Sequence, residues 1–211
     1  AIGRRTETWA SFDGSANGTI EQFTATGEGQ LNLGQVDGLF PVPGLKANTG
    51  SVDYSVTLGQ AGSTSAITTK ATVSGFDGSY DDWTFSNWDI GVDGEAKLDE
   101  KTLTIQQAKL AFSQQAKPQG ELRVTGSLPL GQADGKLELT ATGILAGLLN
   151  TAAQPWLAPV EVTQSQAQTK ATVLLGADGS IALESTGALG QLMLTEGDKP
   201  LLAMPTTIGL A

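Results

Sequence analysis

Apolar and polar residues alternate along most of this chain, and the clearest example runs from residue 103 to residue 143. Three short segments there place apolar side chains at every second position, with polar or small residues between them. This period puts the apolar side chains of a β-strand on one face and the polar side chains on the other. The connections at residues 114–118 and 134–135 are short, and short connections pair neighbouring strands antiparallel. The stretch therefore predicts a β-meander.

The same alternation continues on both sides of this stretch. Six Asp-Gly dipeptides and one Asn-Gly dipeptide occur in the chain, and such pairs favour hairpin turns because they adopt positive φ angles readily. We therefore expect an all-β fold, an elongated antiparallel meander whose hairpins are marked by Asp-Gly pairs. The aromatic residues change parity between Phe85 and Trp88, which indicates a β-bulge. We expect Trp83, Phe85 and Trp88 to belong to the core; a carbohydrate-binding platform is the alternative.

The alternation breaks once, at residues 144–154. Leu145, Leu148 and Leu149 recur there at three- and four-residue spacing, which is typical of one face of a helix. The pattern predicts one short helix that ends at Pro155. We expect the three leucines to form a plug that closes the open end of the sheet and shields its edge. Contact of the same leucines with a membrane or a ligand is the alternative.

Two pairs of similar segments indicate an internal duplication. Residues 31–38 resemble residues 128–135, and residues 69–73 resemble residues 169–173, in the same order and at offsets of 97 and 100 residues. A tandem unit of about 100 residues would explain both matches. The predicted β-repeat units, which would share one continuous sheet and form a single structural domain, are residues 1–97 and 98–211.

The composition excludes several classes of function. The chain has no His and no Cys, which rules out a Ser-His-Asp or Cys-His catalytic site, a disulfide and a thiolate metal site. A net charge of −10 disfavours nucleic acid as a partner, because phosphate binding needs clustered Lys and Arg. Phosphate-binding and dinucleotide-binding motifs are absent from the sequence. We therefore expect a protein that is not an enzyme and has no cofactor, no metal and no nucleic acid partner.

Two phrases in the central stretch suggest a family. Residues 103–112 read Leu-Thr-Ile-Gln-Gln-Ala-Lys-Leu-Ala-Phe, and residues 120–130 read Gly-Glu-Leu-Arg-Val-Thr-Gly-Ser-Leu-Pro-Leu. Their rhythm resembles the periplasmic repeats of AsmA- and TamB-like proteins, with the type II secretion N proteins as looser relatives. The resemblance covers most of residues 19–143 and returns more faintly over residues 160–194.

The resemblance implies a curled β-sheet with an apolar trough, placed in the periplasm of a bacterial cell envelope. The role that it implies is lipid transport between membranes, or assembly of the outer envelope or of secretion machinery, with phospholipid or another acyl-chain lipid as the ligand and envelope membrane proteins as further partners. Proteins of this family usually carry a membrane anchor, whereas this chain has no run of ~20 apolar residues. We therefore expect a fragment of a longer, membrane-anchored protein.

A long sheet with one apolar face needs a cover for that face, and one short helix is too small to provide it. The sheet either curls over an apolar trough, or it pairs with a second sheet as a β-sandwich, the architecture of adhesion and carbohydrate-binding or protein-binding modules. We expect the trough, with the sandwich as the alternative. The lipid-groove candidates share parity within each strand and are Val52, Tyr54, Val56, Leu58, Leu122, Val124, Leu128, Leu130, Leu137 and Leu139.

Overall fold

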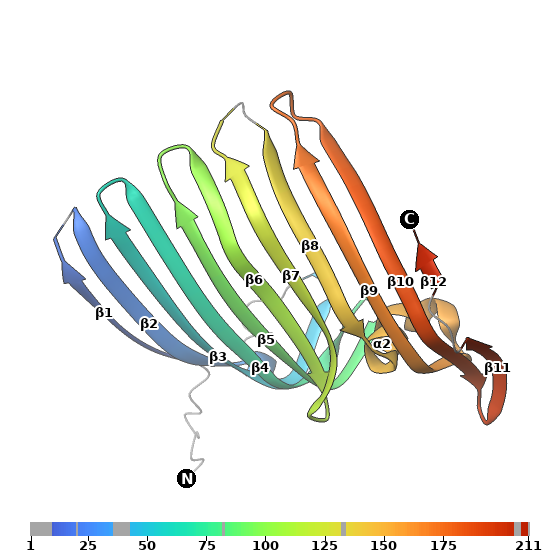
Figure 1. Ribbon diagram of the computed structural model, residues 1–211. Helices are drawn as coiled ribbons and strands as arrows, with labels where there is room; N and C mark the ends of the chain where they lie inside the picture. The colour runs from blue at the N-terminus through green and yellow to red at the C-terminus, as the bar shows by residue number, and fades with distance from the viewer. Residues whose placement is uncertain are drawn as a thin grey trace, which may run out of the picture.

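The computed structural model describes residues 10–19, 21–35, 43–81, 83–131, 134–204 and 208–210. These residues form one antiparallel sheet of twelve strands, with a helix, α2, at one end of it (Figure 1). The strands pair in sequence order from β1 to β11, and β12 pairs with β10. Residues 33–35 are also helical. The element bounds are β1 (Ala10–Gly18), β2 (Gln22–Asn32), β3 (Leu45–Ala61), β4 (Thr64–Tyr80), β5 (Trp83–Leu98), β6 (Thr102–Gln114), β7 (Lys117–Pro129), β8 (Gly135–Ile144), α2 (Ala146–Leu157), β9 (Glu161–Leu175), β10 (Ile181–Glu196), β11 (Lys199–Met204) and β12 (Ile208–Leu210).

The predicted all-β meander is confirmed, and the sheet is a single layer that does not close on itself. No second sheet packs against it in the part of the chain that the structure describes, so the sandwich alternative is not the observed architecture. The total accessible surface is 13649 Å², whereas a compact monomer of 21.7 kDa would expose about 9,200 Å². This excess of exposed surface follows from a sheet whose faces are largely uncovered.

A band of unusual backbone conformations crosses the sheet and bends it. Six residues with positive φ lie beside register shifts on neighbouring strands: Gly50, Gly75, Asn87, Gly120, Gly143 and Gln191. Bulges at such positions kink a strand and increase its twist. We call this band the bend line. Below it, the strands curve round toward α2 at the bottom of Figure 1, and α2 contacts β5, β7 and β9 together.

The hydrophobic core lies inside this bend. Ala47, Phe76 and Trp88 are buried, and the Trp88 side chain is only 2% exposed. The Phe76 and Phe85 rings pack with their centroids 5.6 Å apart. The partly buried residues around this cluster are Leu33, Leu45, Val73, Phe85, Phe112 and Leu148. The parity change in the sequence was thus correctly read as a bulge, and Phe85 and Trp88 belong to the core rather than to an exposed platform.

Helix α2 begins and ends later than the sequence predicts. Leu145 precedes its first turn, where the Leu145 carbonyl accepts a hydrogen bond from the Leu149 amide. The prediction that Pro155 ends the helix is wrong, because α2 continues to Leu157. A proline removes one backbone hydrogen bond and bends a helix without forcing it to stop. Asn150 joins α2 to β9, since its side-chain amide exchanges two hydrogen bonds with the backbone of Val162.

Several Asp-Gly pairs do not form turns, contrary to expectation. The pairs that begin at Asp13, Asp77 and Asp93 lie inside β1, β4 and β5. Their glycines avoid close contacts: a Cβ on Gly94 would lie 2.8 Å from the Thr69 Cγ2, and one on Gly78 would lie 2.3 Å from the Lys46 carbonyl oxygen. The pair at residues 178–179 does lie in a turn, with Gly179 at φ 83°. The pair at residues 37–38 lies outside the described residues.

The two similar segments do not occupy equivalent positions in the sheet. Residues 69–73 lie in β4 and residues 169–173 lie in β9, five strands further along an antiparallel sheet. The two segments therefore run in opposite directions. The same holds for the other matched pair, since residues 31–38 begin at the end of β2 and residues 128–135 begin at the end of β7. The sheet is continuous from β5 to β6, so the division of the chain at residue 97 stays a sequence-based prediction.

Candidate functional site

The register of the strands gathers the apolar side chains into rows that cross the sheet. One row, which we take as the reference, consists of Phe12, Gly29, Tyr54, Ala71, Val92, Leu110, Leu122, Ala141, Thr169 and Gly187. Parallel rows pass through Val52, Val56 and Leu58. None of these four rows contains a charged residue. We call the side of the sheet on which these rows lie the apolar face and the opposite side the polar face.

The polar face carries the charged residues of the same strands. The row next to the reference row contains Asp13, Glu28, Ser55, Lys70, Asp93, Lys109, Arg123, Thr140, Lys170 and Thr186. Glu121 accepts hydrogen bonds from Lys109, at 2.8 Å, and from Arg123. These two cations lower the pKa of the Glu121 carboxyl. The sheet therefore separates charge completely between its two faces over ten strands.

Nine of the ten lipid-groove candidates lie on the apolar face. Val52, Tyr54, Val56 and Leu58 follow one another along β3, as alternation requires. Leu122, Val124 and Leu128 lie on β7, with Leu137 and Leu139 paired beside them on β8. Leu130, the tenth candidate, lies beyond the end of β7 and is 57% exposed. The structure thus brings residues from separate parts of the sequence onto one surface.

Several residues of this surface were missed from sequence. The most relevant are Ile67, Val92, Leu110, Phe112, Val173 and Leu183. The period-two signal was present in each of their segments. A register shift interrupts it on β5 and β6, whereas Ile67, Val173 and Leu183 lie in unbroken register with Leu58 and Leu137. Alternation could have identified them once each bulge had been allowed for.

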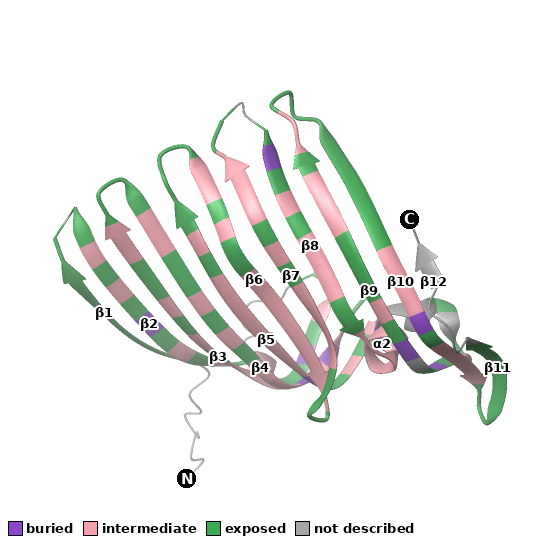
Figure 2. Ribbon diagram, in the orientation of Figure 1, coloured by how far each residue is buried: buried purple, intermediate pink, exposed green. Residues whose placement is uncertain are grey.

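The apolar face is largely uncovered between the bend line and the opposite end of the strands. At that end, hairpins join β1 to β2, β3 to β4, β5 to β6, β7 to β8 and β9 to β10. We call the part of the sheet between the bend line and these hairpins the open sheet. On β2 and β3, residues that are at least partly buried alternate with exposed ones, whereas β1 and the hairpin half of β10 are almost wholly exposed (Figure 2). Near the hairpins, Leu58 is 37%, Ile67 42% and Leu183 67% exposed. Burial of apolar surface is worth roughly 25 cal/mol per Å², so this face has an unused capacity to bind an apolar ligand.

Two aromatic rings cover the apolar face near its β1 edge. A Cβ on Gly27 would lie 2.8 Å from a ring carbon of Phe12, and one on Gly29 would lie 2.6 Å from the Tyr54 hydroxyl. The glycines of β2 therefore allow the rings of neighbouring strands to lie flat on the backbone. The Phe12 ring is nevertheless 70% exposed, because β1 is the edge of the sheet.

Two carboxylates fix the bend line by satisfying the amides that the bulges leave unpaired. Asp89 on β5 accepts a hydrogen bond of 2.9 Å from the Gly75 amide of β4. Reciprocally, Asp77 on β4 accepts one of 2.9 Å from the Asn87 amide of β5. The Thr49 hydroxyl also donates to Asp77. The hydrogen bonds from Asn87 and Thr49 lower the pKa of Asp77. The bend is thus a built feature of the fold, held across three strands.

Helix α2 lies on the apolar face at the bend and bounds the open sheet there. Leu148 packs against the cluster that contains Trp88, and a Cβ on Gly120 would meet the side chains of Ile144 and Leu148. Leu149 is partly buried, as is Leu145 before the first turn. Of the three leucines expected to plug the sheet, Leu148 therefore fills the inside of the bend. The strands that α2 contacts, β5, β7 and β9, are not edge strands.

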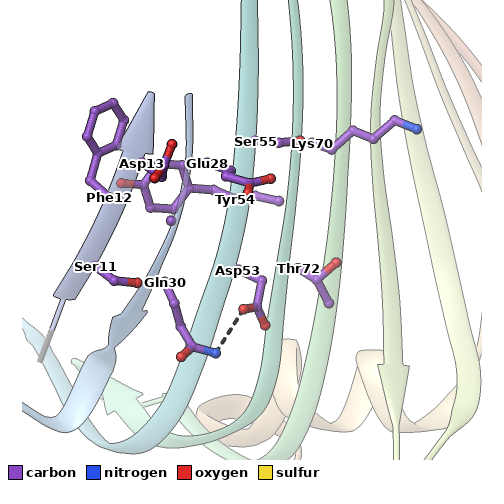
Figure 3. Close-up of a pocket in the computed structure, with 12 residues that line it drawn as sticks. Ser11, Phe12, Asp13, Glu28, Gln30, Asp53, Tyr54, Ser55, Lys70 and Thr72 are labelled. Carbon is purple, nitrogen blue, oxygen red and sulfur yellow. Dashed lines mark hydrogen bonds between the residues drawn. The ribbon is translucent and has the colours of Figure 1, made fainter. Parts of the chain in front are cut away.

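A separate hollow of about 670 Å³ lies on the sheet beside β1, with residues of β1 to β4 around it (Figure 3). Its side chains include the carboxylates of Asp13, Glu28 and Asp53, and Gln30 donates a hydrogen bond of 2.8 Å to Asp53. The described residues contain no group of three or more acidic, His or Cys side chains arranged to hold a metal ion. The hollow is open, and it combines Phe12 and Tyr54 of the reference row with charged side chains, so the uncharged rows of the apolar face are the stronger candidate site for an apolar ligand.

Comparison of the chain with protein-family models, with curated proteins and with solved structures finds no match. No helix among the described residues is long and apolar enough to cross a membrane.

Proposed function

We propose that the apolar face of the open sheet shelters the acyl chains of lipids, and that the protein acts without catalysis. One observation supports this proposal most strongly. Four rows of residues without a charge cross up to ten strands, and the surface that they form is largely uncovered. Each buried acyl methylene would contribute roughly 0.8 kcal/mol. A partly sheltered chain is therefore held without a charged anchor on the protein.

The proposed setting is the periplasm of a bacterial cell envelope, where such a surface would serve lipid transport between membranes or assembly of the outer envelope. Support comes from the resemblance of residues 103–112 and 120–130 to AsmA- and TamB-like repeats. The resemblance implies a curled sheet with an apolar trough, and the observed sheet is a single layer that bends at one end. The proposed partners are phospholipid or another acyl-chain lipid and, in the envelope, membrane proteins.

The test uses Val124, which lies in the middle of the apolar face on β7. A photoreactive amino acid at Val124 should crosslink to lipid in cells, whereas one at Thr125, the next residue on the polar face, should not. Mass spectrometry of organic extracts from the purified protein would identify the lipid. Crosslinking of lipid at Thr125 with equal yield would contradict the proposal.

A melting curve of Val124→Asp separates a lipid surface from an ordinary core. An unpaired charge is costly in a packed core, but on an uncovered face it stays hydrated. We expect Val124→Asp to melt close to the wild type and to lose the lipid crosslink. A collapsed melting transition, together with no crosslink at Val124, would instead favour a binding or adhesion module that covers this face with protein.

A further inference from the structure

The apolar face is closed at one end of its strands and open at the other. On β5, Trp88 at the bend is 2% exposed, whereas Leu98 at the hairpin end is 39% exposed. On β4, Phe76 is 8% and Ile67 is 42% exposed. On β10, Ile181 at the hairpin end reaches 73%. On these three strands, burial therefore rises from the hairpins to the bend line.

The closed end is shaped by elements that lie far apart in the sequence. Helix α2 contacts β5, β7 and β9 there, and Leu148 packs against the cluster around Trp88. Apolar ligand atoms at this end meet side chains from the sheet and from α2. At the hairpin end, apolar ligand atoms contact only the sheet, and their other side is exposed to water. Apolar burial is therefore greatest next to the bend.

The apolar path along a strand is long enough for a whole acyl chain. Ile90 and Leu98 are eight residues apart on β5, which corresponds to about 27 Å at ~3.4 Å per residue. The hydrocarbon core of a bilayer is ~30 Å thick and contains two leaflets, so one lipid tail spans about 15 Å. A tail can thus lie fully on this path while the headgroup stays beyond the hairpins, in water.

From this geometry we infer that lipids enter over the hairpin end, tail first, with the chain ends next to the bend line and the headgroup at the hairpins. The inference rests on the proposed function, and it adds the direction of entry and the class of ligand. The ligand is a long-chain acyl lipid whose polar headgroup is not enclosed by the protein. A polar headgroup at the closed end would lose the contacts with water that it keeps at the hairpins, at a cost in free energy.

The absence of Cys from the chain and the position of Trp88 allow a direct test. Trp9→Phe, Trp83→Phe and Trp156→Phe leave Trp88 as a single fluorescent reporter at the closed end. A fluorophore attached to the cysteine of the Leu98→Cys variant reports on the hairpin end of the apolar face. Lys97→Cys, next to it on the polar face, is the matched control. The protein is incubated with phosphatidylcholine vesicles and then separated from them. The phosphatidylcholine carries a nitroxide either near the acyl carbonyl or near the chain end.

The two probes should give opposite patterns at the two reporters. The chain-end nitroxide should quench Trp88 more than the carbonyl nitroxide does, and the order should reverse at Leu98→Cys. The label on Lys97→Cys should be quenched less than that on Leu98→Cys by both probes. Equal quenching by both probes at each reporter, or the reverse order, would overturn the inference and leave lipid binding intact. No quenching of either reporter, with phosphatidylcholine absent from the separated protein, would overturn the proposed function itself.

Discussion

The bent end and the open sheet are built from the same strands but are stabilised in different ways. At the bent end, the chain folds back on itself, and Phe76 and Trp88 pack against α2 as in an ordinary core. In the open sheet, no second layer of described residues covers the apolar side chains of the same strands, and Leu58 and Ile67 stay exposed. The difference shows that a protein can keep an apolar surface uncovered if a small core elsewhere stabilises the chain.

The largest effect should come from removing the core side chain that closes the bend. We expect Trp88→Ala to destabilise the protein by about 3–5 kcal/mol in urea unfolding, as large-to-small changes of buried aromatic residues do. Leu183→Ala on the open sheet, where the side chain is 67% exposed, should change the free energy of unfolding by at most ~0.5 kcal/mol. Equal losses for the two variants would mean that the open sheet is covered in solution.

A smaller effect should follow from changing the backbone at the bend line. Gly75 has φ 59°, and a Cβ there would meet no atom within 4 Å. Gly75→Ala therefore tests conformation alone, and a left-handed backbone costs an L-residue about 1–2 kcal/mol. Gly59 on β3 offers the same free space without a positive φ, so Gly59→Ala is the matched control. We expect urea unfolding to show destabilisation by Gly75→Ala and none by Gly59→Ala.

These positions also show how much of the fold the sequence could reveal. Alternation predicted the strands and the common face of Val52, Val124 and Leu137, because period two depends on local side-chain direction alone. It did not predict the bend, since the bend depends on bulges that match between strands distant in sequence. The Asp-Gly pairs inside β1, β4 and β5 were wrongly predicted to form turns, for a related reason. Their glycines make room for neighbouring strands, and such contacts are invisible before the register is known.

The hydrogen bonds of Asp77 at the bend should make stability depend on pH. The Asn87 amide and the Thr49 hydroxyl lower the pKa of Asp77 in the folded state, below the unfolded value of about 3.9. The carboxylate therefore stabilises the fold fully above about pH 3.9, and this contribution is lost as the pH falls through the folded pKa. We expect Asp77→Asn to lower the melting temperature at neutral pH and to differ less from the wild type in acid.

Asp53→Asn is the control for this pH profile. The Asp53 carboxylate accepts a hydrogen bond from the side chain of Gln30 on the open sheet, whereas Asp77 accepts one from a bulge amide. Asn in place of Asp77 keeps the size of the side chain and removes its charge. If Asp53→Asn reproduced the pH profile of Asp77→Asn, the effect would be one of general surface charge, and the bend line would have no special part in it.

The smallest effect should come from the ion pairs of the polar face. Lys136 and Glu138 approach to 2.7 Å, but their side chains are 54% and 58% exposed. Exposed pairs of this kind contribute about 0–1 kcal/mol, because water and salt screen them. A double-mutant cycle with Lys136→Met and Glu138→Gln should therefore give a coupling energy below ~1 kcal/mol, which shrinks further in high salt. The stability of the sheet then comes from the strand ladder and from the core at the bend. A coupling energy well above this range, insensitive to salt, would show that the polar face is itself covered, and the contrast between a closed end and an open sheet would fail on that side.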